Sequence, residues 1–473
     1  MPNAEGYFGR MTDPTLWSAT EQARAIAARQ LGSVELLDLC LERIARVDAL
    51  VNAVCTLDID RARTRAREAD EATARGESWG PLHGLPFTVK DAIATEGLRS
   101  TGGSETLADH VPTSDAPAVA RLKAAGAVLF GKTNLPEWSG NWQSFNPMFG
   151  TTNNPWDLAL TPGGSSGGAA AAVACGMTSF ELGTDIGGSI RVPSAFCGVF
   201  GHKPSFGVIP TIGYLDEPHG GTTESDINTF GPIARSAADL RMLLDVLVGP
   251  LPNKAAAWRL TLPESRHDSL RGLRVAAWVD EPALEIDASV ALALHRAISA
   301  MEAAGALVDR TARPNFDVER VWRLGARLIG AAVSVSDEHD RGLSHRHWLL
   351  LDRERSALIT AWADFFEDFD VVVCPVTVLP AFAHLQGGRW DTRTITVNGR
   401  ERPYPELEGW PALIGAAYLP STVVPVGLTP DALPVGMQIV SPFLNDKKSL
   451  KVASLVADEA GGYVAPPIVR SGG

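Results

Sequence analysis

Two glycine-rich segments that carry serine hydroxyls are the parts of this chain best suited to chemistry. The first runs from Thr161 to Ala169 (TPGGSSGGA), and the second from Gly183 to Pro193 (GTDIGGSIRVP). Closely spaced glycines remove side-chain bulk, so several backbone N–H groups can converge on one anion. That anion can be a phosphate group or the oxyanion that develops when a nucleophile attacks a carbonyl carbon. The two segments therefore predict either phosphate binding or acyl transfer.

Two familiar motifs fit these segments poorly. A nucleotide-binding loop needs Lys followed by Ser or Thr at the end of G-x-x-x-x-G, and neither segment has that order. The stretch Gly164–Gly168 does satisfy G-x-S-x-G, the nucleophile elbow of α/β-hydrolases, but an elbow needs a strand directly before it. Residues 153–162 (NNPWDLALTP) are typical of a loop. His384, the one histidine after residue 347, lies in a Pro- and Gly-rich stretch where a structural role is more common than a triad base.

Lysine can replace histidine as the base of a serine hydrolase, and Lys90 is the candidate. It follows the apolar run Phe87–Val89 in HGLPFTVKD, so its amine would be carried into the interior, where the charged form is disfavoured. The alternative is a structural lysine paired with Asp91, because lysine is rarely buried without a partner. Lys90 alone favours the structural role, and its combination with the serine-bearing loops favours the base.

The elements that must position these residues change character along the chain. Up to residue 79 the pattern is helical: Ser18-x-x-Glu21 predicts a capped helix start, and residues 34–47 have apolar side chains at helical spacing. The arginine-rich stretch 58–75 is interpreted as a solvated helix face rather than a basic binding helix. We therefore predict a helical arm over residues 1–79, packed on a catalytic domain that spans residues 80–473.

From residue 85 onward, short β runs alternate with helices, which indicates α/β organisation. The pattern predicts strands at 87–89, 128–130, 273–278, 371–374, 422–426 and 435–440, and helices at 116–125, from 168 onward and at 289–304. Since these strands come from distant parts of the chain, we expect one sheet in a single large domain. The break at 249–271, rich in Pro and polar residues, leaves two lobes as an alternative.

The composition narrows the possible partners. The chain has 473 residues, 45% of them hydrophobic and 21% charged, as in a soluble globular enzyme. A formal net charge of −13 opposes binding to nucleic acid or anionic lipid, and no signal peptide or membrane-spanning run is visible. Five cysteines without a C-x-x-C pair fit a reducing cytoplasm. His345 and His347 lack carboxylate support, so no metal is expected.

Together these segments resemble the amidase signature family of serine hydrolases. The resemblance rests on Gly163–Gly168, Gly183–Arg191 and Thr88–Asp91, in the family's order and spacing. Similar segments extend it from about residue 16 to about residue 459, namely Gly131–Pro136, Phe149–Gly150, Asn154–Trp156, Gly231–Arg235 and Leu433–Gln438. The resemblance implies an α/β fold with a large twisted mixed β-sheet covered by helices on both faces. It also implies a hydrolase that cleaves C–N bonds of carboxylic amides without a cofactor.

The resemblance assigns a role to each candidate catalytic residue. Ser189 would be the nucleophile that forms an acyl-enzyme, and Lys90 the base. Ser165, held after a non-proline cis peptide bond, would relay the proton between them and return it to the leaving nitrogen. Backbone N–H groups at Ile186, Gly187, Gly188 and Ser189 would hold the oxyanion. Positions that brace the loops in the family match Ser166, Thr184, Asp185 and Arg191.

Residues 137–149 (EWSGNWQSFNPMF) run along the substrate pocket in the resembled family. The candidate pocket residues are Trp138, Gly140, Trp142 and Phe145, with Phe149 beyond them. These aromatic side chains either favour an aryl or long apolar substrate or belong to the core. Residues 219–228, where adjacent glycines precede a polar run, are expected to form another wall of the pocket or a lid.

Several members of the family share these motifs, so the bond that is cleaved stays open. We expect hydrolysis of small aryl or alkyl amides, with a urethanase acting on carbamates as the closest alternative. A component of a tRNA-dependent amidotransferase and a non-catalytic binding protein are the alternatives from other classes. The expected partner is a small molecule rather than nucleic acid or a membrane, and a homodimer is possible because dimers are the commonest assembly.

Overall fold

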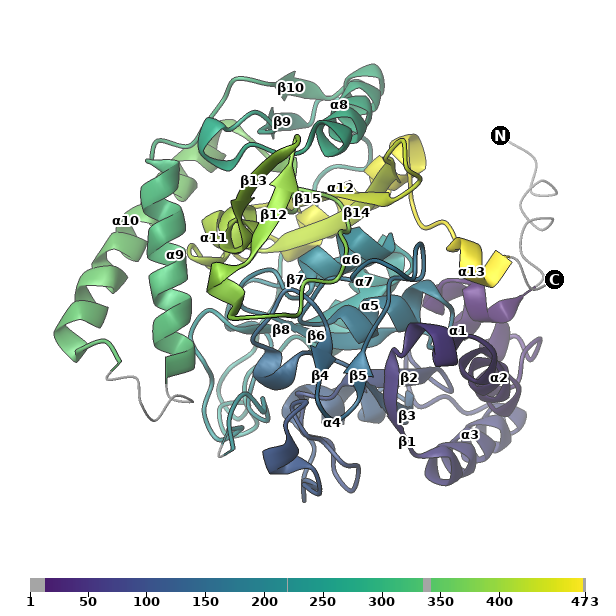
Figure 1. Cartoon of the computed structure of the whole chain (residues 1–473). Helices are drawn as coiled ribbons and strands as arrows, with labels where there is room; N and C mark the ends of the chain where they lie inside the picture. Colours follow the sequence, from purple (N-terminus) through teal and green to yellow (C-terminus); the bar gives the residue numbers. More distant parts are fainter. Residues whose placement is uncertain (1–12, 219, 335–341, 471–473) are drawn as a thin grey trace.

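A mixed sheet of eleven strands forms the centre of the molecule. The computed structural model describes residues 13–218, 220–334 and 342–470 (Figure 1). In spatial order the strands are β1 (Val54–Leu57), β3 (Val128–Thr133), β2 (Pro86–Lys90), β6 (Glu181–Asp185), β8 (Thr229–Ala234), β7 (Phe200–Lys203), β14 (Ser421–Leu428), β15 (Pro434–Val440), β11 (Val371–Pro375), β9 (Arg274–Ala277) and β10 (Leu307–Asp309). Two hairpins lie outside this sheet: β4 (Phe145–Asn146) with β5 (Gly150–Thr151), and β12 (Thr394–Val397) with β13 (Arg400–Pro403).

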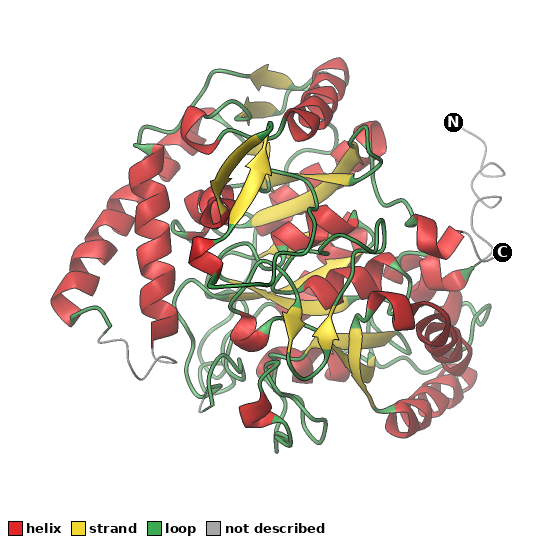
Figure 2. Cartoon of the chain, in the orientation of Figure 1, coloured by secondary structure: helices red, strands yellow, loops and turns green. Residues whose placement is uncertain are grey.

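Helices cover both faces of the sheet, which confirms the α/β fold class with a large mixed sheet (Figure 2). They are α1 (Ala19–Ala27), α2 (Ser33–Val51), α3 (Ile59–Ala74), α4 (Pro117–Ala124), α5 (Gly167–Ala174), α6 (Arg191–Cys197), α7 (Ala237–Leu247), α8 (Ala288–Ala303), α9 (Val318–Val333), α10 (His345–Asp368), α11 (Gly409–Gly415), α12 (Asp446–Ala460) and α13 (Pro467–Arg470). Helices α5 and α6 pack against each other, and α7, α12 and α8 form a second contiguous row.

Strands from the two ends of the chain meet in the middle of the sheet. Residues 201–203 of β7 pair with residues 421–423 of β14 in antiparallel fashion. The expected assembly of one sheet from distant segments is therefore confirmed, and strands from both sides of the break at 249–271 belong to it. All six strands predicted from the sequence are present, as β2, β3, β9, β11, β14 and β15.

The amino-terminal segment is mostly helical but not entirely so. Ser18 and Glu21 form the predicted capping box at the start of α1, where Ser18 N donates to the Glu21 carboxylate at 2.9 Å. In α3 the buried side chains are alanines spaced three or four residues apart, so its arginines face outward as expected. The segment also supplies β1, an edge strand that pairs antiparallel with β3 and that the sequence pattern did not predict.

Helix α5 brings the first glycine and serine loop into the core. All eight of its residues are buried, and each is Gly, Ala or Val. Such small side chains let the helix pack closely against β6, β8 and β2. The loop that precedes α5 is therefore fixed beside the carboxyl ends of the parallel strands β2 and β6.

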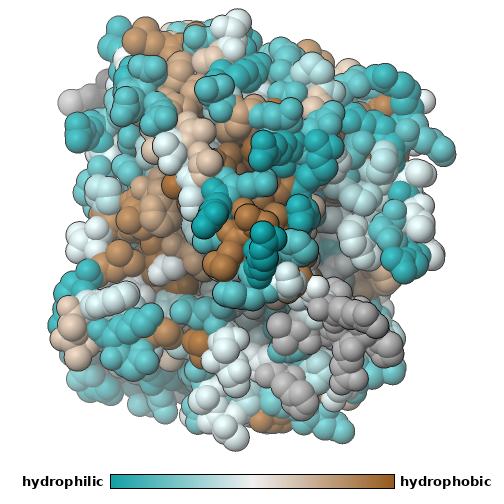
Figure 3. All heavy atoms as spheres, turned by 90° about the vertical axis from the view of Figure 1, so that its left-hand side faces the viewer, coloured by the Kyte–Doolittle hydropathy of each residue, from teal (hydrophilic) through white to brown (hydrophobic). Residues whose placement is uncertain are grey.

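Helices α9 and α10 pack on each other along one side of the molecule, at the left in Figure 1. Viewed from that side, apolar and hydrophilic side chains form adjoining patches (Figure 3). Exposed apolar residues on these two helices are Val333, Leu349 and Leu350. Within residues 13–218, 220–334 and 342–470, no helix combines the length and apolar character needed to cross a bilayer.

Candidate active site

The three predicted catalytic residues come from neighbouring elements. Lys90 is the last residue of β2, which runs parallel to β6. Ser165 lies two residues before the start of α5, and Ser189 lies between β6 and α6. Because parallel neighbours end at the same edge of a sheet, the connections after β2 and β6 open on one side. All three side chains are buried, with 5% of Ser189 accessible.

The amine of Lys90 is held by two hydroxyl groups. Its Nζ lies 2.6 Å from Ser165 Oγ and 2.7 Å from Thr184 Oγ1. Burial lowers the pKa of Lys90 to about 7, although the charges of Asp185 and Glu181 act in the opposite direction. A substantial fraction of the lysine is thus neutral near pH 7, and a neutral amine at this distance can accept the proton of Ser165. The pairing with Asp91 is absent among the described contacts of Lys90: Asp91 accepts from Thr101 instead.

The loop around Ser165 has an unusual backbone. The peptide bond between Gly164 and Ser165 is cis, which confirms the arrangement that the resemblance implied. Ser144 Oγ donates to Gly163 O at 3.0 Å and accepts from Gly167 N at 3.0 Å. It therefore bridges the residues on the two sides of Ser165. A methyl group on Gly164 would lie 2.7 Å from Asn141 O. A side chain at this position would therefore displace the backbone that supports Ser165.

Two of the predicted bracing residues join the serine loops to each other. Ser166 Oγ donates to Thr184 O at 3.2 Å, and Ser166 N donates to Ser189 O at 3.1 Å. Within the described residues, no hydrogen bond joins Ser165 Oγ to Ser189 Oγ directly. The two hydroxyl groups are thus carried by loops that are hydrogen-bonded through their backbones.

Asp185 and Arg191 form a fully buried ion pair inside the second loop. Arg191 Nη2 lies 2.8 Å from Asp185 Oδ1, and the same carboxylate accepts from the backbone N–H groups of Gly188 and Ile190. Arg191 Nη1 also donates to Gln438 Oε1 on β15 at 3.1 Å. The ion pair therefore sets the shape of the loop and ties it to a strand from the far end of the chain.

The backbone N–H groups of the second loop divide into two kinds. Among the hydrogen bonds of the described residues, none engages the N–H groups of Ile186, Gly187 or Ser189. Gly188 differs, because its N–H donates to Asp185 Oδ1 at 2.9 Å. The N–H of Gly188 is therefore engaged inside the loop in this structure, and the oxyanion role predicted for Gly188 stays a prediction. Gly188 also has a conformational role: its φ is +103°, where glycine is favoured.

Comparisons with known proteins identify the family of this chain. The sequence profile of the family described as Amidase matches residues 35–324 and 326–450. The chain belongs to the amidase signature family. It is 32% identical to a glutamyl-tRNA(Gln) amidotransferase component of Acidothermus cellulolyticus, over 94% of each chain. It is 33% identical to indoleacetamide hydrolase of Bradyrhizobium diazoefficiens, over 94% of this chain and 87% of the hydrolase.

Solved structures of the family superpose over almost the whole chain. A structure described as an amidase is 28% identical, with a TM-score of 0.79, over 94% of this chain and all of the other. A chain from a vestigial protein complex linked to the origins of an s-triazine catabolic enzyme is 27% identical, with a TM-score of 0.82, over 95% of this chain and all of the other. The present chain is accordingly an enzyme of the amidohydrolase type, as predicted.

The predicted pocket residues of this amidase lie in different surroundings. Trp142 contacts the second glycine-rich loop (Gly183–Pro193), called the catalytic loop below, because its Nε1 donates to Gly187 O at 2.9 Å. Trp138, in a short turn of 3-10 helix, packs over Gly102, and Phe145 lies under the guanidinium group of Arg393. Gly140 is exposed. The described contacts thus bring one of the four, Trp142, to the catalytic loop.

Sequence reasoning missed several residues around the site. Tyr214 is buried and lies close to Thr184, the residue that holds Lys90. Tyr404 donates to Asn141 Oδ1 at 2.7 Å, next to Trp142, and its ring packs against that tryptophan. Neither residue lies in a recognisable motif, and more than 260 positions separate Tyr404 from Asn141. Such pairings leave no local signal in a sequence.

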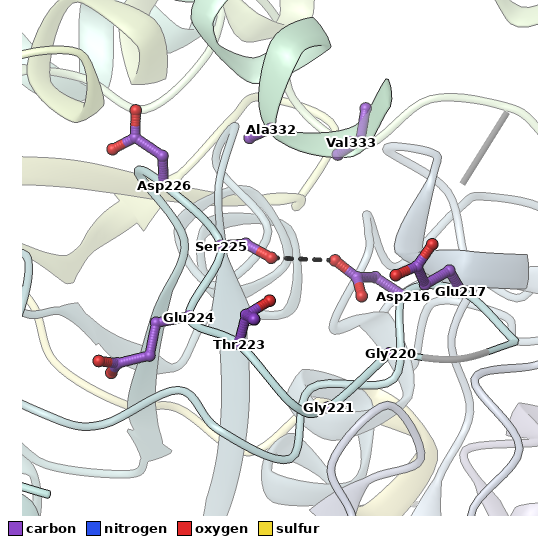
Figure 4. Close-up of a pocket in the computed structure, with 10 residues that line it drawn as sticks. All are labelled: Asp216, Glu217, Gly220, Gly221, Thr223, Glu224, Ser225, Asp226, Ala332 and Val333. Atoms are coloured by element: carbon purple, nitrogen blue, oxygen red, sulfur yellow. Dashed lines mark hydrogen bonds between the residues drawn. The ribbon is translucent and has the colours of Figure 1, made fainter. Parts of the chain in front are cut away.

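A cavity of about 220 Å³ lies between residues 216–226 and the end of α9 (Figure 4). Part of the segment 219–228 lines this cavity, but none of the predicted catalytic residues does, so a role of the segment as a wall or lid of the substrate pocket stays a prediction; His219 lies outside the described residues. Ser225 points toward Asp216 and donates to its carboxylate at 3.2 Å. Asp226 points away from the centre and pairs with Arg355 at 2.7 Å. The cavity is thus lined with acidic groups, with Ala332 and Val333 on its α9 side.

The histidine pair considered as a metal site lies at the start of α10, where His345 stacks on Trp348. Across the described ranges, no three His, Cys, Asp or Glu side chains come together as metal ligands would. The part of the chain that the structure describes therefore adds no support for a metal at this pair.

Proposed function

We propose that this enzyme hydrolyses small aryl or alkyl amides through an acyl-enzyme on Ser189. The observation that carries the proposal is the 2.6 Å distance between Lys90 Nζ and Ser165 Oγ, in a buried site where the pKa of the lysine is lowered to about 7. A neutral lysine next to a serine hydroxyl is the base that a serine hydrolase without a catalytic histidine requires.

In the proposed mechanism, Lys90 accepts the proton of Ser165 while Ser165 takes the proton of Ser189. The oxygen of Ser189 attacks the substrate carbonyl, and the N–H groups of Ile186, Gly187 and Ser189 stabilise the oxyanion. Ser165 then returns a proton to the leaving nitrogen, because an amine leaves poorly unless it is protonated as the C–N bond breaks. Water releases the acyl group by the same steps in reverse.

The similarity to a hydrolase named for indoleacetamide supports an amide with an aromatic group near its carbonyl. Trp142 at the catalytic loop provides an aromatic surface for such a group. Carbamates are the second candidate, since they present the same carbonyl carbon and nitrogen. The chain's charge of −13 argues against direct binding of tRNA.

A fluorophosphonate probe tests the nucleophile. The unaltered protein is expected to form a covalent adduct that Ser189→Ala abolishes. Ser194→Ala is a matched control, because Ser194 is buried in α6 five residues further along and its hydroxyl has no hydrogen-bond partner among the described residues. Labelling that persists in Ser189→Ala would contradict the assignment.

A substrate panel then tests the bond type. Anilides, primary amides and aryl carbamates of the same acyl size are compared by kcat/KM. The proposal expects amides to be the better substrates. Preference for the carbamate would make the enzyme a urethanase that uses the same residues. If the protein reacts with the fluorophosphonate probe but hydrolyses no compound of the panel, a role inside a larger complex is favoured.

A further inference from the structure

Glu408 is a buried acid that the proposed mechanism does not use. It ends a short 3-10 segment, η8 (Tyr404–Glu408), directly before α11, and 6% of its surface is accessible. Among the hydrogen bonds and ion pairs of the described residues none involves its carboxyl group, and its Oε1 is buried without a partner. Buried carboxyl groups in folded proteins are normally paired, so this one requires an explanation.

The carboxyl group of Glu408 borders the catalytic loop. A methyl group built on Gly187 would lie 3.6 Å from Glu408 Cγ, 3.8 Å from its Cδ and 3.4 Å from Ile329 Cδ1. Gly187 has no side chain, and its N–H is one of the three free donors described above. A substrate whose carbonyl oxygen is held by these donors would therefore lie next to Glu408.

Among the residues that the structure describes, no cation is paired with Glu408. Burial alone raises the pKa of Glu408 to about 8, and no charged side chain contributes. Ile329, the other close neighbour of Gly187, lies about one helical turn before Ala332 and Val333, which line the acidic cavity. Acidic groups on this side of a protein of net charge −13 attract cations toward the site.

We propose that Glu408 binds a protonated amino group on the acyl part of the substrate, so that the preferred substrates are amides of amino-substituted acids. This inference rests on the proposed amide hydrolysis. An ammonium group supplies three N–H donors and compensates the charge of a buried carboxylate. The acyl part is chosen because Ser165 must lie beside the leaving nitrogen, whereas Glu408 lies against Gly187, one of the proposed oxyanion donors.

Two matched anilides test the inference. The p-nitroanilides of β-alanine and of butyric acid have the same length and differ in an ammonium group that replaces a methyl group. The unaltered enzyme is expected to prefer the β-alanine compound at least about tenfold in kcat/KM, as charge-assisted hydrogen bonds imply. Glu408→Gln is expected to reduce this preference about tenfold or more.

Glu406→Gln is the control, because Glu406 lies on the same segment and its carboxylate pairs with Arg402 at 2.6 Å. It is expected to leave the preference unchanged. The preference is the ratio of two kcat/KM values measured on one preparation. A misfolded fraction of a variant lowers both values equally and leaves the ratio unchanged. Glu408→Lys should reverse it toward the p-nitroanilide of succinic acid, which carries a carboxylate at the same place.

The outcomes separate this inference from the proposed function. Hydrolysis of both anilides with no preference for the ammonium compound, or a preference that Glu408→Gln leaves intact, would overturn the role of Glu408 and leave amide hydrolysis standing. Hydrolysis of neither compound by the unaltered enzyme would overturn both. A preference lost in Glu406→Gln as well as in Glu408→Gln would also contradict the specific role of Glu408.

Discussion

As the proposed base, Lys90 is expected to set the pH range in which this enzyme works. Its pKa is lowered to about 7, chiefly by burial, and it acts as a base only when neutral. We therefore expect kcat/KM for an anilide to rise about tenfold per pH unit below pH 7 and to level off above it. The profile is measured from about pH 5 to 9, with Lys90→Ala expected to lower the plateau rate above pH 7 by roughly 10²- to 10⁴-fold and to remove this pH dependence. A flat profile for the unaltered enzyme would contradict the assignment of the base.

The ion pair between Asp185 and Arg191 makes a prediction about stability. Asp185→Ala would leave a buried guanidinium group without its carboxylate, which typically costs about 3–5 kcal/mol. The free energy of unfolding in urea measures this loss. The exposed pair of Arg320 and Glu354 is the control, and Glu354→Ala is expected to cost less than about 1 kcal/mol. Equal losses for the two variants would mean that the buried pair has no special structural role.

At the scale of elements, the loop between β6 and α6 depends on the conformation of Gly188. Its φ is +103°, and a methyl group there would lie 2.9 Å from Pro411 Cγ. Gly188→Ala is expected to lower the free energy of unfolding by about 1–3 kcal/mol and to reduce fluorophosphonate labelling. Gly187→Ala, with an ordinary φ and no contact closer than 3.4 Å, is expected to unfold almost like the unaltered protein. Thermal unfolding of the two variants makes the comparison.

The sequence revealed the elements whose local pattern is strong. Strands such as β11, with a run of valines, and helix α5, with its alanines, were predicted because apolar runs and small residues are visible locally. Strand β1 is four residues long between two helices, and β8 contains Gly and Pro, so neither has a clear strand pattern.

The candidate site was predictable where it coincides with motifs and unpredictable where it depends on distant contacts. The two serine loops and Lys90 were visible as local patterns, the family resemblance implied the roles of Ser165 and Ser189, and the structure places Lys90 against Ser165. The commitment of the Gly188 N–H to Asp185 depends on how the loop folds, which spacing does not reveal. Glu408 joins the site only because α11 packs beside α9 and the loop.

At the scale of the whole molecule, all five cysteines are free thiols that lie wholly or partly inside the protein. Burial raises the pKa of Cys40 and Cys374 to about 12, so almost no reactive thiolate forms near neutral pH. We expect iodoacetamide to leave the activity of the folded enzyme intact and to label all five cysteines after denaturation. Mass spectrometry counts the modified residues. Rapid inactivation of the folded enzyme would indicate a thiol that contributes to catalysis.

The order of strands also has a consequence for biosynthesis. Lys90, Ser165 and Ser189 all leave the ribosome within the first 189 residues, whereas β14 and β15, against which β7 and α6 pack, are made last. Arg191 finds its partner Gln438 only when nearly the entire chain has emerged. A nascent chain therefore contains Ser189 long before the strands that pack against β7 and α6 are made, and we expect the site to become active only after these strands have been added. Chains stopped before residue 421 should accordingly fail to react with a fluorophosphonate, although they contain all three catalytic residues.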